Sequence, residues 1–265
     1  MKSPKEIALD KKINKLIKPY PIAAKFVKAL MEDEELHELQ EYANIVSIRR
    51  LGFNDHGPVH MREVAVNALT MLELLRKAGI NTSLEENEAG NYEMSICGVF
   101  AAAFMHDLGM TVGREGHEKM SCILAVPILD RILSEHYSVR ERVIIKTLAI
   151  EGISGHMATQ RIHSVEAGLI LIADGCDMER GRARIPLAIN TEPKVGDIHK
   201  YSANSILCVS ISEGEEKPIK IDVNMEADVG FFQIEEVLIP KINSSPVRSH
   251  IELYAGVNGD RKRYL

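Results

Sequence analysis

Seven of the ten histidines lie between residues 56 and 163, and six of these are candidates for a site: His56, His60, His106, His117, His156 and His163. Two carboxylates stand beside them in apolar surroundings. Asp107 follows His106 at the end of the segment MSICGVFAAAFMH, and Asp174 follows the apolar run AGLILIA. A buried carboxylate is costly to desolvate unless a positive charge compensates it. Imidazole nitrogen together with carboxylate oxygen suits zinc, manganese, iron or nickel better than calcium, which prefers oxygen ligands. One such residue alone is more often a hydrogen-bonded histidine or a helix-capping aspartate, and it is their combination that indicates a transition-metal site.

The helix that carries the first of these histidines can be placed from its neighbours. Pro58 suits the first turn of a helix, which we expect over 58–77 and which contains His60. His56 lies four residues before His60, the spacing of one helix face, but it precedes the proline. Upstream, the apolar residues of 34–49 recur at three- and four-residue steps, which predicts an amphipathic helix.

The segment 94–106 is apolar on every side, which predicts a helix buried at the centre of a domain. His106 and Asp107 would then lie at its carboxyl end. Residues 79–93 are polar and contain glycine, which predicts a solvent loop. Further helices are expected over 117–135, with a kink or break at Pro127, over 138–151 and over 163–180.

After about residue 190 the sequence changes from helix-like patterns to segments typical of strands. Residues 205–212, 219–225 and 250–257 are rich in β-branched residues and predict strands. Residues 229–242 predict a short helix that stops near Pro240. We therefore expect a mainly α protein with a helical metal-binding domain over 1–190 and a small α+β domain over 191–265. An exposed strand edge in the second part could pair two copies into a homodimer.

The residues in this order resemble the HD-domain superfamily of metal-dependent phosphohydrolases. HGPVHMREVAVNAL is similar to its first-histidine helix, AAAFMHDLGM to its buried helix ending in His-Asp, and LILIADGCDMERGRAR to its last-aspartate helix. The resemblance spans about residues 54–186. It implies an HD-type bundle of five or more helices around a metal, with His60, His106, Asp107 and Asp174 as ligands.

The same resemblance implies a second ion, because His117 and His156 match the extra histidines of two-metal members, with Asp107 bridging. A dinuclear site is favoured over a mononuclear one. His56 departs from the pattern, since some relatives have an acidic ligand there, and His163 is expected to cap the next helix. The HD-GYP subgroup has a Gly-Tyr-Pro motif and a pair of adjacent histidines, and this chain lacks both. Their absence argues against cyclic-di-GMP as the substrate.

The implied activity is hydrolysis of a phosphoester or phosphoanhydride, of a nucleotide-like substrate, by a metal-activated water. Asp107 would bridge or orient the metals, and with one ion bound His117 or His156 could act as general acid. Four cations are candidates for phosphate binding or for a solvated basic face: Arg114, Lys119, Arg182 and Arg184. Two alternatives stay open: a di-iron oxygenase of the same superfamily, and a non-catalytic nucleotide-binding or interaction module.

Composition limits the other classes of function. The net charge of −6 disfavours long nucleic acid as a partner. The charged N-terminus lacks an apolar signal core, and no run reaches the roughly 18 apolar residues that span a bilayer. None of the four cysteines forms a C-x-x-C pair, which is typical of free thiols in a reducing compartment. The cytoplasm is the expected location.

Overall fold

A computed structural model describes residues 2–180, 182 and 197–265, and the side chains of 197–200 are not described. It begins with three helices, α1 (Pro4–Ile17), α2 (Pro21–Glu32) and α3 (Glu34–Ile45). Ser3 and Glu6 form a capping box at α1, and the Asp33 side chain caps α3. The helix α3 continues as a π-helical segment, η1 (Val46–Leu51), which ends at Gly52 with φ of 69°. That positive φ suits glycine.

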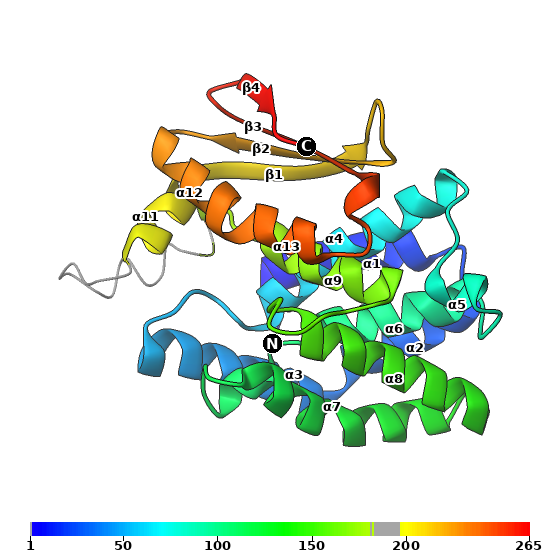
Figure 1. The fold of residues 1–265 in the computed structure, drawn as a ribbon. Coiled ribbons are helices and arrows are strands. Elements are labelled where there is room, and N and C mark those ends of the chain that lie inside the picture. The colour runs from blue at the N-terminus through cyan, green and yellow to red at the C-terminus, as the bar shows by residue number, and fades with distance from the viewer. Residues whose placement is uncertain (1, 181, 183–196) are drawn as a thin grey trace.

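Two helices form the centre of the helical part (Figure 1). The helix α4 is Pro58–Lys77, as the sequence predicts, with Pro58 in its first turn. The helix α6 is Tyr92–Met105, and Glu93 is its only residue that is not buried. The stretch Tyr92–Thr111 is long and apolar enough to cross a membrane, but 94% of it is buried inside the protein. It is therefore accounted for as a core helix, and the described residues contain no other candidate span.

The remaining helices around this centre are α5 (Ser83–Glu86), η2 (Leu108–Thr111), α7 (His117–Ser134), α8 (Val139–Gly155) and α9 (Val165–Cys176). The short helix α5 lies inside the region predicted as a loop. A kink or a break was predicted at Pro127, and the break is wrong, because α7 runs through this residue. Proline removes the hydrogen bond to the carbonyl four residues earlier, that of Ile123. Ile123 is 61% exposed, so water can replace the lost donor on the solvent side of the helix.

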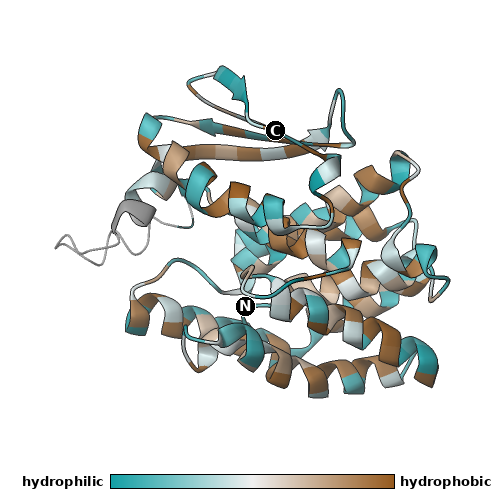
Figure 2. Ribbon diagram, in the orientation of Figure 1, coloured by the Kyte–Doolittle hydropathy of each residue, from teal (hydrophilic) through white to brown (hydrophobic). Residues whose placement is uncertain are grey.

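The C-terminal part contains α11 (Asp197–Ser205) and a sheet of β1 (Ile206–Glu213), β2 (Ile219–Met225), β3 (Ile251–Val257) and β4 (Asp260–Arg263). The strand order is β1-β2-β3-β4. The pair β2–β3 is parallel, with Val223 opposite Ala255, and the other two pairs are antiparallel. The sequence did not predict β4, whose four charged residues are exposed and hydrophilic (Figure 2).

A helical connection joins the parallel strands β2 and β3. It consists of η3 (Asp228–Gly230), α12 (Phe231–Gln233), η4 (Ile234–Leu238), α13 (Ile239–Ser244) and η5 (Arg248–His250). The predicted stop near Pro240 is wrong, because the helical connection continues through this proline to Ser244. In Figure 1 the connection runs beneath the sheet toward α9, and η4 and α13 contact α9.

The fold is therefore mainly α with a small α+β part at its C-terminal end, as predicted. The expected boundary near residue 190 lies outside the described residues. Within those residues, one hydrophobic core includes Phe100 of α6, Ile170 of α9, Leu238 of the connection and Val223 of the sheet. The C-terminal part thus completes the core of the helical part.

Candidate metal centre

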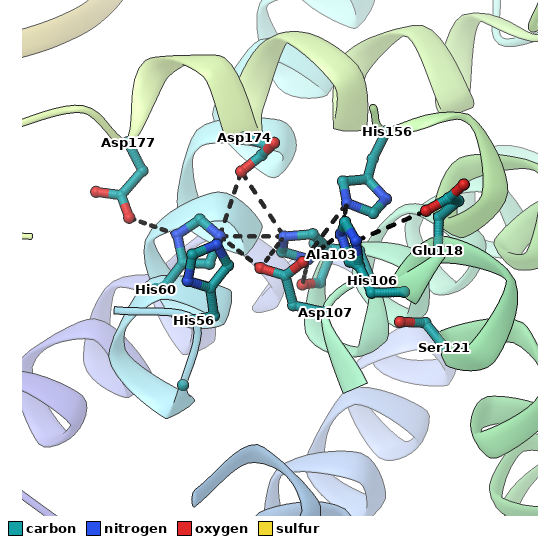
Figure 3. Close-up of polar contacts among 12 residues, drawn as sticks. His56, His60, Ala103, His106, Asp107, Glu118, Ser121, His156, Asp174 and Asp177 are labelled. Atoms are coloured by element: carbon teal, nitrogen blue, oxygen red, sulfur yellow. Dashed lines mark hydrogen bonds and ion pairs between the residues drawn. The ribbon is translucent and has the colours of Figure 1, made fainter. Parts of the chain in front are cut away.

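Six predicted ligand residues from five regions of the chain come together, and Figure 3 labels five of them, all but His117. The six are His60 in the first turn of α4, His106 and Asp107 after α6, His117 at the start of α7, His156 after α8 and Asp174 within α9. The histidines and Asp107 are almost completely buried. The structure therefore brings together every residue that the HD-domain resemblance assigns to metal binding.

The first group of ligand atoms consists of His60, His106, Asp107 Oδ2 and Asp174 Oδ1. His60 Nε2 lies 3.1 Å from His106 Nε2, 3.2 Å from Asp107 Oδ2 and 3.2 Å from Asp174 Oδ1. His106 Nε2 lies 3.3 Å from Asp107 Oδ2 and 3.8 Å from Asp174 Oδ1. Both Nε2 atoms thus lie close to each other and to one oxygen of each aspartate, and two nitrogens with two oxygens form the donor set of a transition-metal site.

The second group consists of His117, His156 and the other oxygen of Asp107. His117 Nε2 lies 3.0 Å from His156 Nε2 and 3.2 Å from Asp107 Oδ1. His156 Nε2 lies 3.5 Å from the same Oδ1. Asp107 therefore gives one oxygen to each group, which is the arrangement of a bridging carboxylate between two ions.

The outer nitrogen of each imidazole is already engaged. The Nδ1 atoms of His106, His117 and His156 donate to the carbonyl oxygens of Ala103, Arg114 and Ile153, over 2.9, 2.8 and 2.6 Å. His60 Nδ1 donates to Asp177 Oδ2 over 2.6 Å. These bonds fix the ring orientations and leave the Nε2 atoms to take a proton or a metal ion. Within each group two Nε2 atoms face each other, so a cation between them satisfies both.

The charges around the first group also favour a cation. Burial would raise the pKa of Asp107, yet His106 and the other histidines hold it well below its usual range. Burial and Arg182 both act to lower the pKa of His60, but hydrogen bonds to three carboxylates raise it to about 10. In the second group, burial lowers the pKa of His156 to about 4. His156 is therefore neutral near pH 7, the form that binds a metal.

Gly109 explains why His117 can approach Asp107. A Cβ at this position would overlap the backbone carbonyl oxygen of His117, so only glycine lets η2 pack against the start of α7. The Gly109 N–H donates to Ser121 Oγ over 2.8 Å, which fastens the same contact. On the opposite side, buried Gln40 of α3 donates to the carbonyl of Phe104 near the end of α6. Both contacts hold the His106–Asp107 turn in place.

Two functional candidates were missed by the sequence analysis. Asp177 accepts from His60, and its spacing of three from Asp174 on one helix could have indicated it. Lys241 of α13 contacts Asp174 Oδ2 and donates to the carbonyl of His156 over 2.9 Å. No local signal marks Lys241, because its role comes from the docking of a distant segment.

The predicted phosphate-binding cations separate into three cases. Arg182 lies at the centre, with Nη2 3.1 Å from His60 Nε2. Arg114 lies beside His56, with Nη1 3.4 Å from His56 Nε2. Lys119 is exposed, and Arg184 lies outside the described residues.

Two further histidines lie outside both groups. His56 is not among the ligand atoms, because its Nδ1 lies 2.6 Å from the carbonyl oxygen of Asn54 and its Nε2 faces Arg114. The expectation that His163 caps the next helix is wrong, because Ser164 is the N-cap of α9.

Comparison with known proteins places the chain in a family but does not indicate its function. The chain is 38% identical over 232 residues to the uncharacterized protein MJ1020 of Methanocaldococcus jannaschii, and the match covers 88% of each chain. The chain belongs to the family of that protein. No family model and no solved structure matches it.

Proposed function

We propose that the chain is a metal-dependent hydrolase of phosphoesters or phosphoanhydrides, of the HD-domain type that its sequence resembles. The observation that supports this most strongly is the division of Asp107 between two groups of imidazole nitrogens. The ligands follow one another along the chain in the order of the HD-domain pattern: His60, His106, Asp107, His117, His156 and Asp174.

The first group would hold one divalent ion of manganese, iron, nickel or zinc, and the second group another. Such ions lower the pKa of a bound water toward about 7 and neutralise charge on phosphoryl oxygens. Asp107 would be shared between them. The neutral state of His156 near pH 7 favours its role as a ligand over that of general acid, which would need a proton.

Arg182 is the cation best placed to bind a substrate phosphate. Its Nε and Nη1 donate to the carbonyl oxygens of Asp55 and Asp177 over 2.9 and 2.8 Å, so the guanidinium plane is fixed. Nη2 is directed at the first group. A fixed planar donor beside a metal centre suits phosphoryl oxygens. Arg114 would supply a second positive charge near the same place.

The cellular setting follows as part of the same proposal. The described cysteines are all free thiols, and burial raises the pKa of Cys97 to about 12, so it is unreactive. Free cysteines suit the reducing cytoplasm. The strands β1 and β4 each have one partner strand in the described sheet, and either edge could pair with a second copy.

The test is a metal analysis of purified protein, combined with turnover of phosphomonoesters, phosphodiesters and nucleoside triphosphates with each of the four metals. We expect bound metal and metal-dependent release of phosphate or alcohol. Asp107→Ala should lose both while keeping its helical circular dichroism. Asp130→Ala, at an exposed carboxylate paired with Lys146, is the matched control and should keep both.

Full turnover by Asp107→Ala would show that the assignment is wrong. Oxygen-dependent turnover with a mixed-valent iron spectrum would assign the centre to oxygen activation instead.

A further inference from the structure

Lys241 is a buried cation that belongs to neither group of ligand atoms but contacts residues of both. Its ammonium lies against Asp174 Oδ2, the oxygen that does not face the histidines. The same ammonium donates to the carbonyl oxygen of His156 over 2.9 Å. Only 9% of the residue is exposed. Because α13 belongs to the C-terminal part, this contact joins that part directly to the centre.

Two glycines of α9 allow the C-terminal part to come this close. A Cβ at Gly175 would lie 3.1 Å from Lys241 Cδ and 3.3 Å from Leu238 Cδ1. A Cβ at Gly168, two turns earlier, would lie 2.6 Å from Ser245 Oγ and 3.1 Å from Pro246 Cδ. The Ser245 hydroxyl donates to the Gly168 carbonyl over 3.1 Å. The two glycines thus let residues 238–246 pack closely against α9 at both ends of the contact.

We infer that Lys241 is a positioning residue of the metal centre, and that the C-terminal part is a required component of it. By holding Oδ2, the ammonium turns Oδ1 of Asp174 toward His60 and His106. By holding the carbonyl at the end of α8, it also fixes the backbone that presents His156. This inference rests on the proposed metal-dependent function.

The direction in which metal affinity changes when Lys241 is removed distinguishes a positioning role from simple charge repulsion. An ammonium near a cation repels it, so loss of that repulsion alone would strengthen metal binding. Loss of a group that orients a ligand weakens metal binding, typically by about 10- to 100-fold. Without Lys241, the buried Oδ2 of Asp174 also loses its donor, so the carboxylate is no longer held in the orientation that directs Oδ1 at His60 and His106.

The experiment measures Co²⁺ binding to the full chain by competition with a chromophoric chelator, together with the visible spectrum of the bound ion. Lys241→Met should weaken Co²⁺ binding by about 10- to 100-fold and change the spectrum, because the ligation by Asp174 changes. Lys241→Arg, which keeps charge and donors, should recover part of the affinity. Lys217→Met is the matched control, because its ammonium donates to the carbonyl of Ile251 in the sheet. It should bind Co²⁺ as the wild type does.

Equal or tighter binding by Lys241→Met, with an unchanged spectrum, would overturn the inference even if the variant were less stable. A wild-type chain that binds no Co²⁺ would instead remove the proposed function. If Lys241→Met does not fold, Gly175→Ala displaces the lysine stem and gives the test. A spectrum of Gly175→Ala identical to that of the wild type would then contradict the inference.

Discussion

Asp177→Asn tests whether a residue outside the ligand set controls the first group. Asp177 Oδ2 accepts from His60 Nδ1 over 2.6 Å, a short charge-assisted hydrogen bond. Burial would raise the pKa of Asp177, but this bond and the charge of His60 keep it lowered, so the residue is a carboxylate. An asparagine oxygen can still accept the bond but carries no charge, so the imidazole becomes a weaker base toward a metal.

The size of the effect follows from that contact. Loss of such an outer partner weakens metal binding by about 10- to 100-fold. This corresponds to about 1.4–2.8 kcal/mol. With metal in excess of the dissociation constant, the metal stabilises the folded state by that much less. At about 2–4 °C per kcal/mol for a chain of this size, the metal-induced rise in Tm should shrink by about 3–11 °C.

Differential scanning calorimetry with Co²⁺ and with chelator measures this directly, and chelator competition gives the affinity. Asp130→Asn, at an exposed carboxylate, should leave the metal-induced rise unchanged. A rise in Asp177→Asn equal to that of the wild type would refute the reasoning that His60 is a metal ligand supported by Asp177.

The other predictions concern substrate, pH and packing. Arg182→Lys cannot reproduce the planar donors and should lower kcat/KM on the order of 10- to 100-fold with metal content unchanged, as steady-state kinetics and metal analysis will show. Burial lowers the pKa of His56 from 6.5 to about 3, so only the unfolded state takes up this proton near pH 5. Stability is therefore lost as pH falls below 6.5, by about 2 kcal/mol at about pH 5, and His56→Asn should remove this loss in urea unfolding. Gly109→Ala should destabilise the fold by about 1–3 kcal/mol and reduce metal stoichiometry, because its Cβ would overlap the carbonyl of His117. A urea midpoint equal to that of the wild type would contradict this last expectation.

The helices that carry the ligands were predictable where local signals agree with the fold. Pro58 marks the start of α4, and the segment ending at His106 is too apolar for anything but the core. The prolines gave wrong helix ends, because the effect of a proline depends on its position in the helix. Pro127 faces a solvent-side carbonyl within α7, and Pro240 lies in the first turn of α13, so neither ends its helix.

The six candidate ligands were predictable mainly because their order along the chain resembles the HD-domain pattern. The residues alone marked only His106–Asp107 and Asp174, whose polarity is conspicuous beside apolar runs. Lys241 was not predictable, because an ordinary lysine in an amphipathic segment gives no sign of the carboxylate that it meets across the fold. The sequence showed Arg182 only as a positive charge that could bind phosphate or belong to a solvated basic face. Its fixed plane depends on the carbonyls of Asp55 and Asp177, which a sequence does not bring together.

The most direct test of the central claim is an anomalous-scattering map from crystals of protein prepared with manganese or zinc and without chelator. We predict one peak among His60, His106, Asp107 and Asp174, and a second peak between His117 and His156 on the other oxygen of Asp107. A map without any peak among these side chains, at full metal load, would contradict the claim.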